Sequence, residues 1–273
     1  MLRSANDRTA ATSGRPDGLT EIHATAVEGF TKGTDAYERA RPSYPPDAVA
    51  LVVEVLGIGP SSIVVDLAAG TGKFTRLLVP TGARIIAVEP VEAMRAKLTA
   101  IVPGVEVRDG AAERLPCPDA SLDCVTVAQA FHWFRATEAL AEIRRVLRPD
   151  GGLALLWNSR DASVPWVDRL NRVIRWNTGE IPVYDSGTED WAGLVAGVGG
   201  FTPLQHQSFR HEQEMDLSLL LDRVSSTSYI AALPDDERAG VLEEVRAVVA
   251  EAGLPDAFAL PHRTDVYWCT KPA

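Results

Sequence analysis

The residues of this sequence best suited to chemistry are two acids, each at the end of a short apolar run, and a glycine-containing loop. Asp66 ends a run rich in β-branched residues, and Gly70 and Gly72 follow it closely. Glycine lacks a Cβ atom, so the backbone can adopt unusual dihedral angles and a ligand can approach it closely. Glu89 ends a second apolar run, 23 residues beyond Asp66. A carboxylate at that position of a doubly wound sheet can accept both hydroxyls of a ribose, which predicts a nucleotide-like cofactor.

Three kinds of glycine loop could follow such a strand, and the spacing separates them. A P-loop requires G-x-x-x-x-G-K-S/T, but Phe74 stands where the Mg²⁺-binding hydroxyl belongs. A dinucleotide loop requires G-x-G-x-x-G/A, and the third small residue would be Thr75 or Lys73, depending on the register. The remaining pattern is an acid followed by alternating glycines, with Ala68 in place of the first glycine. A tight turn that binds no ligand is the alternative at this point.

His132 is the titratable side chain best placed to take part in a reaction. It follows the apolar run 122–128 and Gln129, and it stands between the aromatic residues Phe131 and Trp133. An unperturbed imidazole has a pKa of about 6.5 and can act as a general base near neutral pH. The alternative is that His132 only positions the loop, while its aromatic neighbours form a wall of the site.

Apolar runs alternate with segments of helical periodicity, which predicts an α/β fold with a parallel, doubly wound sheet. The expected strands are residues 63–67, 84–89, 105–109, 122–128 and 153–157. Pro46 opens the first helix. A later helix is expected to turn Val146 and Leu147 inward and to end at Pro149–Gly152. In a sheet of this kind the site lies at the C-terminal ends of the strands.

The residues after the fifth strand are expected to hold substrate specificity. Amphipathic helices are expected over 164–177 and 191–198, as a helical insertion, and over 217–233 and 235–252. Trp166, Trp176, Trp191 and Tyr229 could equally line an apolar pocket or belong to the core. Two further strands, 201–215 and 262–270, are expected to pair in antiparallel fashion and to close the sheet. The predicted organisation is a disordered tail (1–20), a lid and first helix (21–60), a cofactor-binding core (61–160) and a substrate-side part (161–273).

Composition and charge narrow the classes of partner. The chain has 273 residues and a formal net charge of −10, so it has no generally basic surface and we expect no nucleic-acid substrate. The three cysteines and five histidines show neither disulfide nor metal-ligand spacing, so no metal is predicted. No stretch is apolar enough to span a membrane, and no apolar signal segment begins the chain. We therefore expect a cytoplasmic protein, either a monomer or a homodimer.

Taken together, these stretches resemble the class I S-adenosylmethionine (SAM)-dependent methyltransferases. The similarity is strongest to the type 11 group, which includes trans-aconitate methyltransferases and the C-methyltransferases of ubiquinone and menaquinone biosynthesis. It covers about residues 30–160, with weaker similarity at 224–234. The matching stretches are Asp66–Gly72, Ala87–Pro90 with Met94, Gly110–Pro116, Ala128–Phe134 and Val146–Gly152. The resemblance implies a seven-stranded Rossmann-like sheet with SAM as the cofactor and a small molecule as the substrate.

The resemblance also assigns roles to individual residues. The methionine part of SAM would lie over the loop that contains Asp66, Ala68, Gly70 and Gly72. Glu89 would hold the ribose, a role that does not by itself separate SAM from NAD. Pro90 follows it, and Met94 could either lie against the adenine or belong to the core. Ala112 and Glu113 would line the adenine, and Gln129 would lie near the sulfonium. Tyr37 and Arg41 resemble the segment that covers the cofactor in this family.

One departure from the family pattern concerns the adenine. Many relatives carry an acid immediately before the Ala-Glu pair, where this chain has Ala111. Either Glu113 and backbone groups hold the adenine amino group, or Asp109 reaches over to it. Two other functions are compatible with the same fold, namely a cyclase or isomerase and a non-catalytic SAM-binding protein.

Overall fold

The computed structural model describes residues 41–176 and 190–273, so the predicted tail (1–20) and Tyr37 lie outside the described residues. The strands are β1 (Ile63–Leu67), β2 (Arg84–Val88), β3 (Glu106–Arg108), β4 (Leu122–Ala128), β5 (Leu147–Arg160), β6 (Gln205–Asp216) and β7 (Ala257–Thr270). They form one sheet in the order β3-β2-β1-β4-β5-β7-β6. The first five strands run parallel, whereas β7 is antiparallel to both β5 and β6. The predicted seven-stranded, doubly wound sheet is thus confirmed.

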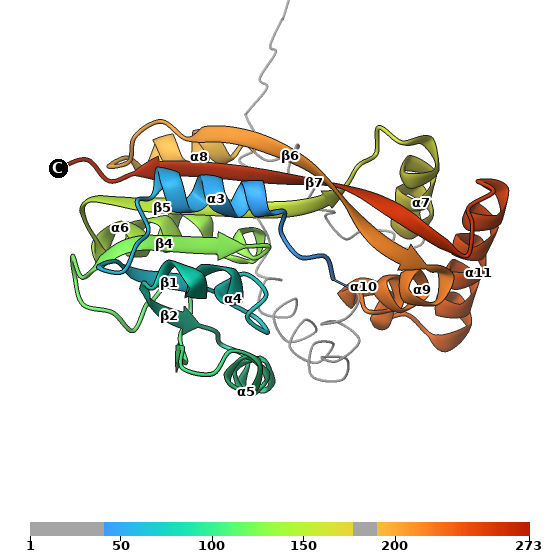
Figure 1. The fold of residues 1–273 in the computed structure, drawn as a ribbon, viewed down its shortest axis with the longest axis horizontal. Helices are drawn as coiled ribbons and strands as arrows, with labels where there is room; N and C mark the ends of the chain where they lie inside the picture. Colours follow the sequence, from blue (N-terminus) through green and yellow to red (C-terminus); the bar gives the residue numbers. More distant parts are fainter. Residues whose placement is uncertain (1–40, 177–189) are drawn as a thin grey trace, which may run out of the picture.

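Helices cover this sheet and extend it at one end (Figure 1). The α-helices are α3 (Pro46–Val55), α4 (Thr75–Leu78), α5 (Glu92–Ile101), α6 (Ala136–Val146), α7 (Pro165–Trp176), α8 (Trp191–Val198), α9 (Leu217–Ser225), α10 (Ser228–Ala231) and α11 (Asp235–Glu251). Two short 3₁₀ helices are η1 (Val79–Thr81) and η2 (Phe131–Trp133). The helices expected between the last two strands are present as α9, α10 and α11.

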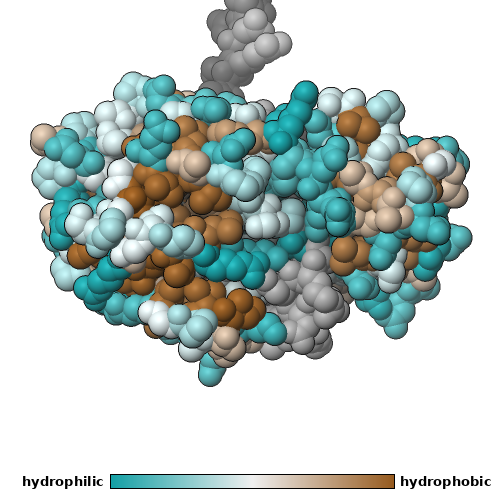
Figure 2. All heavy atoms as spheres, viewed as in Figure 1, coloured by the Kyte–Doolittle hydropathy of each residue, from teal (hydrophilic) through white to brown (hydrophobic). Residues whose placement is uncertain are grey.

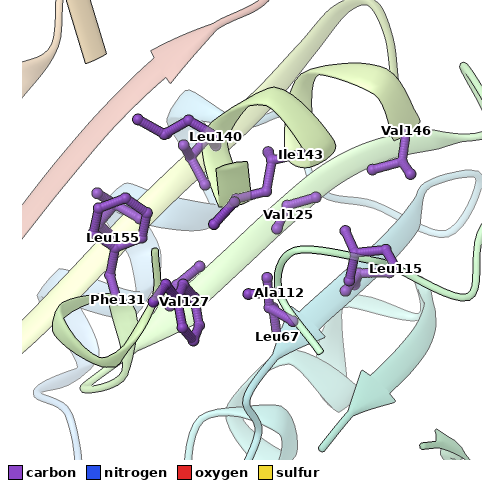
Figure 3. Close-up of a cluster of buried hydrophobic side chains, with 14 of the residues drawn as sticks. Leu67, Ala112, Leu115, Val125, Val127, Phe131, Leu140, Ile143, Val146 and Leu155 are labelled. Carbon is purple, nitrogen blue, oxygen red and sulfur yellow. The ribbon is translucent and has the colours of Figure 1, made fainter. Parts of the chain in front are cut away.

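One face of the sheet packs against α6 and α8. Leu140, Ile143 and Val146 recur at helical spacing on α6 and are fully buried. Figure 3 shows these side chains against Val125 and Val127 of β4. Because α6 is fixed in this way, the loop that joins β4 to it is held at the C-terminal end of the sheet.

The opposite face and the far end of the sheet have their own cores. On the opposite face, Val52 of α3 and Phe74 before α4 belong to a cluster with Leu156 of β5. A further cluster joins α7, α9 and α11 to the ends of β6 and β7, with Leu170 and Val245 among its buried members. In Figure 1 these helices lie together beyond the C-terminal end of β5. They belong to residues 161–273, whose role in substrate specificity stays a prediction.

The junction between α6 and β5 differs from the prediction. The helix ends at Val146, and Leu147 is already extended and pairs with Leu122 of β4. Pro149–Gly152 therefore lie within β5 and do not end the helix. Pro149 accounts for part of this, since a residue before a proline avoids the helical region and Arg148 is extended. Leu147 is held extended by its pairing with Leu122. The strand also reaches Arg160, three residues beyond its predicted end.

Figure 2 shows the polarity of one face of the molecule. Hydrophobic residues gather over the sheet near α3, and a more hydrophilic band separates this area from α9 and α11. Within residues 41–176 and 190–273, no helix is both long and apolar enough to cross a lipid bilayer.

Candidate active site

The strand register brings the predicted site residues to one edge of the sheet. Leu67 pairs with Val88 on one side and with Val127 on the other, and Val88 pairs with Arg108. The loops that follow β1, β2, β3 and β4 therefore leave the sheet side by side. These are the loops that carry Asp66–Gly72, Glu89–Met94, Asp109–Glu113 and Gln129–His132.

The loop after β1 depends on residues in left-handed backbone. Ala68 has φ 53°, Gly70 has φ 57° and Gly72 has φ 84°. A Cβ atom at Gly72 would lie 2.9 Å from Cγ of Leu98 on α5, so both the dihedral angle and the packing favour glycine there. A Cβ atom at Gly70 would lie 3.6 Å from Sδ of Met94, which places this predicted adenine neighbour against the loop.

We expect Ala68→Gly to stabilise the protein. An L-residue in left-handed backbone destabilises the folded protein by about 1–2 kcal/mol. The greater conformational freedom that glycine gives the unfolded chain lowers stability by about 0.4–1 kcal/mol. The free energy of unfolding should therefore rise by about 0.5–1 kcal/mol in urea titrations. Ala69→Gly is the matched control, because Ala69 is not in left-handed backbone and this change should destabilise the protein. Equal destabilisation by both changes would contradict strain at Ala68.

Asp66 is buried, and its hydrogen bonds connect three elements. Its side chain is 1% exposed, and its carboxylate accepts hydrogen bonds from Thr75 Oγ1 at 2.6 Å and Thr126 Oγ1 at 3.0 Å. Burial raises the pKa of Asp66 to about 6, and the nearby charge of Glu89 adds to this effect. The two threonines belong to α4 and β4, so Asp66 connects β1 to both. Neither threonine was predicted from the sequence to contribute to the site.

Glu89 lies at the end of β2 and fixes two backbone segments. It is 4% exposed, and its two carboxylate oxygens accept hydrogen bonds from the N–H groups of Gly70 at 2.8 Å and Val91 at 2.9 Å. Burial raises the pKa of Glu89, although the same two N–H groups oppose the shift. The acid predicted to hold a ribose is thus placed directly against the glycine loop. Pro90, which follows it, is exposed.

The loop after β3 carries the residues predicted to line an adenine. Ala112 is buried, and a carboxylate oxygen of Glu113 accepts a hydrogen bond from the backbone N–H of Arg135 at 2.9 Å. Asp109 forms an ion pair with Arg95 at 3.1 Å. The Arg95 guanidinium also donates to the backbone carbonyl of Glu89 at 2.8 Å. Glu113 therefore joins two loops of this edge, and Asp109 joins β3 to α5.

Gln129 follows β4 in a conformation that the sheet holds firmly. Its φ is 61°, its backbone N–H donates to the carbonyl of Leu156 at 2.8 Å, and its Nε2 donates to the carbonyl of Asn158 at 2.9 Å. Asn158 in turn donates from Nδ2 to the carbonyl of Ser43 at 3.1 Å. Sequence reasoning missed Asn158, although its place directly after the predicted fifth strand could have indicated it.

His132 is half-buried and its hydrogen bonding identifies its tautomer. The indole Nε1 of Trp157 donates to His132 Nδ1 at 3.2 Å. Because an indole can only donate, Nδ1 is the unprotonated nitrogen and the neutral ring carries its proton on Nε2. Burial lowers the pKa of His132 to about 4, and the charge of Arg41 adds to the shift. Arg41 and His132 therefore lie within electrostatic reach of each other.

The aromatic residues near His132 belong mainly to the core. Trp157 stacks on Trp191 with ring centroids 4.9 Å apart, and Phe131 meets Trp191 edge to face at 5.4 Å. Both tryptophans are buried, as is Phe131. Trp166 packs against Phe258 at the other end of the molecule. Trp166 and Trp191 therefore pack in hydrophobic clusters, which favours a core role for both over the lining of a pocket.

Comparisons with known proteins agree with this arrangement. Residues 65–155 match the family described as a methyltransferase domain, in its type 11 group. A methyltransferase-like protein of Schizosaccharomyces pombe is 35% identical over 242 residues, which cover 87% of this chain and 93% of that protein. A methyltransferase of Mycobacterium tuberculosis is 38% identical over 238 residues, covering 86% and 92% respectively.

A solved structure supports the same fold. The structure described as a type II methyltransferase from Anaeromyxobacter dehalogenans has a TM-score of 0.57 and 24% identity, and the match covers 84% of this chain and 96% of that one. Sequence identity to the relatives extends over most of the chain, well beyond the glycine loop. The protein belongs to the class I SAM-dependent methyltransferases, in the type 11 group, and its cofactor is SAM.

Proposed function

We propose that the protein transfers the SAM methyl group to an oxygen, nitrogen or carbon nucleophile of a small molecule, with carboxylic acids and secondary metabolites as candidate substrates. The observation that supports the proposal is the buried carboxylate of Glu89 beside the loop Ala68–Gly72, in which three residues have left-handed backbone dihedral angles. This pair lies at the sheet edge where the polar groups of Gln129 and His132 also emerge. Family membership supplies the reaction class, and the site residues give it a location.

The residues at this edge fit SAM. A carboxylate offers about four acceptor positions, and backbone N–H groups use two of those on Glu89, so two remain for the ribose hydroxyls. Met94 provides an apolar surface beside the loop for the adenine, and Ala112 and Glu113 belong to the neighbouring loop. Gln129 would face the sulfonium. Arg41, with Tyr37 before it, would meet the carboxylate of the cofactor.

Asp66 would contribute to this site indirectly, by holding the loop after β1 in shape. Both of its carboxylate oxygens already accept hydrogen bonds from threonines, and it is 1% exposed. We therefore assign it to holding the loop in shape, in company with Gly72. Glu89 is the acid we assign to direct contact.

The chain's contribution to catalysis is positioning. SAM supplies a methyl group that its sulfonium has already activated. The protein must then hold a nucleophile in line with that group, which alone can contribute several kcal/mol to lowering the barrier. Gln129 and Asn158 are suited to this task because hydrogen bonds to neighbouring backbone fix both residues.

His132 is better suited to donating a hydrogen bond than to removing a proton. Its Nδ1 accepts from Trp157, so Nε2 carries the proton that can be offered to an acceptor oxygen. A group with a pKa of about 4 also has only a small driving force for taking up a proton near neutral pH. We therefore propose that His132 orients the acceptor and that the general-base alternative does not apply.

The pH dependence of the reaction tests this role. If His132 only orients, the wild-type rate should show no limb near pH 6.5, and His132→Asn should keep the shape of the profile. The loss in kcat should be smaller than the ~10²–10⁴-fold that removal of a general base costs. The measurement is kcat across pH for the wild type, His132→Asn and His132→Ala. A limb near pH 6.5 that disappears in both variants would restore the base.

Methyl transfer from labelled SAM to a panel of small molecules tests the proposed function. We expect label to appear in at least one acceptor, and the variant Glu89→Ala to lose activity through weaker SAM binding. Conversion of a small molecule into a product that carries no label would indicate the cyclase or isomerase alternative. SAM binding in calorimetry with no turnover of any acceptor would favour a non-catalytic SAM-binding protein.

A further inference from the structure

Three basic residues lie in one row across neighbouring strands at the far end of the sheet. Arg160 of β5 pairs with His262 of β7, and His262 pairs with His211 of β6. Residues directly opposite each other project to the same face of a sheet, so the three side chains share one face. Arg160 and His211 are half-buried and His262 is fully buried. Arg160 Nε donates to Asn171 Oδ1 of α7 at 2.6 Å.

A fourth basic residue packs over this row from α9. Arg223 is 5% exposed, and its guanidinium donates to His262 Nε2 at 3.2 Å and to Gln213 Oε1 at 3.3 Å. Because Nε2 accepts from an arginine, His262 is neutral and donates from Nδ1 to the carbonyl of Leu260 at 2.8 Å. A guanidinium stays charged at any accessible pH, so this row contains a buried positive charge.

Positive charge acts on both histidines of the row. Burial and the charge of Arg223 lower the pKa of His262 to about 2, and His211 and Arg160 add to the shift. Burial and Arg223 also lower the pKa of His211. The chain as a whole has a formal net charge of −10, so the basic row differs in sign from the rest of the molecule. A site of this kind favours an anion.

The row lies close to the residues proposed to position the acceptor. Asn158 is two residues before Arg160 on β5, on the same face and about 7 Å away along the strand. Its Nδ2 and backbone carbonyl meet Ser43 and Gln129, and Thr264 of β7 donates to its Oδ1. Hydrogen bonds thus connect Gln129 through Asn158 to Thr264, whose hydroxyl oxygen lies 3.4 Å from His211 Nδ1.

We propose that Arg160, His211 and Arg223 form a subsite that binds a carboxylate of the acceptor substrate, with His262 holding Arg223 in place. The proposal rests on the proposed methyl transfer and adds the substrate class, an anionic small molecule held at one end by this row. An arginine fork suits a carboxylate, since it can donate two parallel hydrogen bonds. The separation from Gln129 places the methylated atom several bonds away from the anchoring carboxylate.

Binding of acetate by the full-length protein, saturated with S-adenosylhomocysteine, tests this subsite. The readout is the ring NMR signals of the histidines, with acetamide as the neutral probe of similar shape. We expect acetate to shift the signals of His211 and His262 in a saturable way and acetamide to leave them in place. His206 is an internal control, because its position on β6 projects to the opposite face.

Substitutions make the test specific. Arg223 is buried, and its removal could unfold the protein, so Arg160→Gln is the informative variant. It should weaken acetate binding about tenfold or more, while SAM affinity in calorimetry stays at the wild-type value. Arg210→Gln is the matched control, because Arg210 lies on the other face of β6, is 78% exposed and pairs with Asp161. It should leave acetate binding unchanged.

The outcomes separate the two proposals. Equal responses to acetate and acetamide, or unchanged acetate affinity in Arg160→Gln, would overturn the subsite. Tighter binding of inorganic phosphate than of acetate would overturn its assignment to a carboxylate. If SAM itself does not bind the wild-type protein, the proposed function fails. Normal SAM binding without an acetate response removes only the subsite.

Discussion

Glu89→Ala is expected to weaken SAM binding by about 1.5–3 kcal/mol, which is about tenfold to a hundredfold in affinity. The reason is that hydrogen bonds to a charged carboxylate are stronger than those between neutral groups. Glu89 is positioned by the N–H groups of Gly70 and Val91, so its remaining acceptor positions are fixed before SAM binds. Isothermal titration calorimetry with SAM gives the affinity directly.

Two further variants make this result interpretable. Glu89→Gln keeps the shape and one acceptor oxygen, so its loss of affinity should be intermediate. Glu92→Ala removes an exposed acid nearby on α5 and should leave binding unchanged. Urea titrations of each variant show whether the fold persists. Wild-type affinity in a folded Glu89→Ala protein would mean that Glu89 does not hold the ribose.

The second large effect concerns Asp66 and the pH dependence of stability. The pKa of Asp66 is about 6 in the folded protein and 3.8 as a reference for the unfolded chain. Between these values the folded state holds more protons, so stability falls as pH rises from about 4 to 6 and then levels off. A difference of about two pKa units corresponds to about 3 kcal/mol.

Asp66→Asn should remove this contribution while keeping the size of the side chain. Its amide can accept from one threonine and donate to the other, because a hydroxyl can play either part. Between pH 4 and pH 7, the unfolding free energy of the wild type should therefore fall by up to about 3 kcal/mol more than that of the variant. Urea titrations at both pH values measure this difference. An identical pH dependence in both proteins would show that Asp66 is not protonated in the window.

Local sequence signals predicted the half of the fold that carries the cofactor site. The β-branched run before Asp66 and the run before Glu89 gave strands close to their observed bounds, because such runs suit strands buried on both faces. The same order of strands and acids placed the glycine loop and Glu89 at one edge. The end of α6 was predicted less well, because Leu147 pairs with Leu122 of β4 and Arg148 stands before Pro149, so both residues are extended.

The contacts between distant segments could not be predicted. Arg160, His211 and His262 are separated by about 50 residues each in sequence, and only the register of β5, β7 and β6 brings them together. The role of Trp157 in fixing the tautomer of His132 likewise depends on side-chain packing. Asp66 was expected to contact the cofactor, and its hydrogen bonds to Thr75 and Thr126 became visible only in three dimensions.

Calorimetric titration of the full-length protein with SAM, and separately with NAD, tests the central claim most directly. We expect SAM to bind at one site and to raise the melting temperature, with about 2.7 kcal/mol of stabilisation at a hundredfold excess over Kd. NAD should neither bind nor shift the melting temperature, because the loop after β1 lacks the third small residue of a dinucleotide site. Binding of NAD without binding of SAM would contradict the assignment of this sheet edge to SAM.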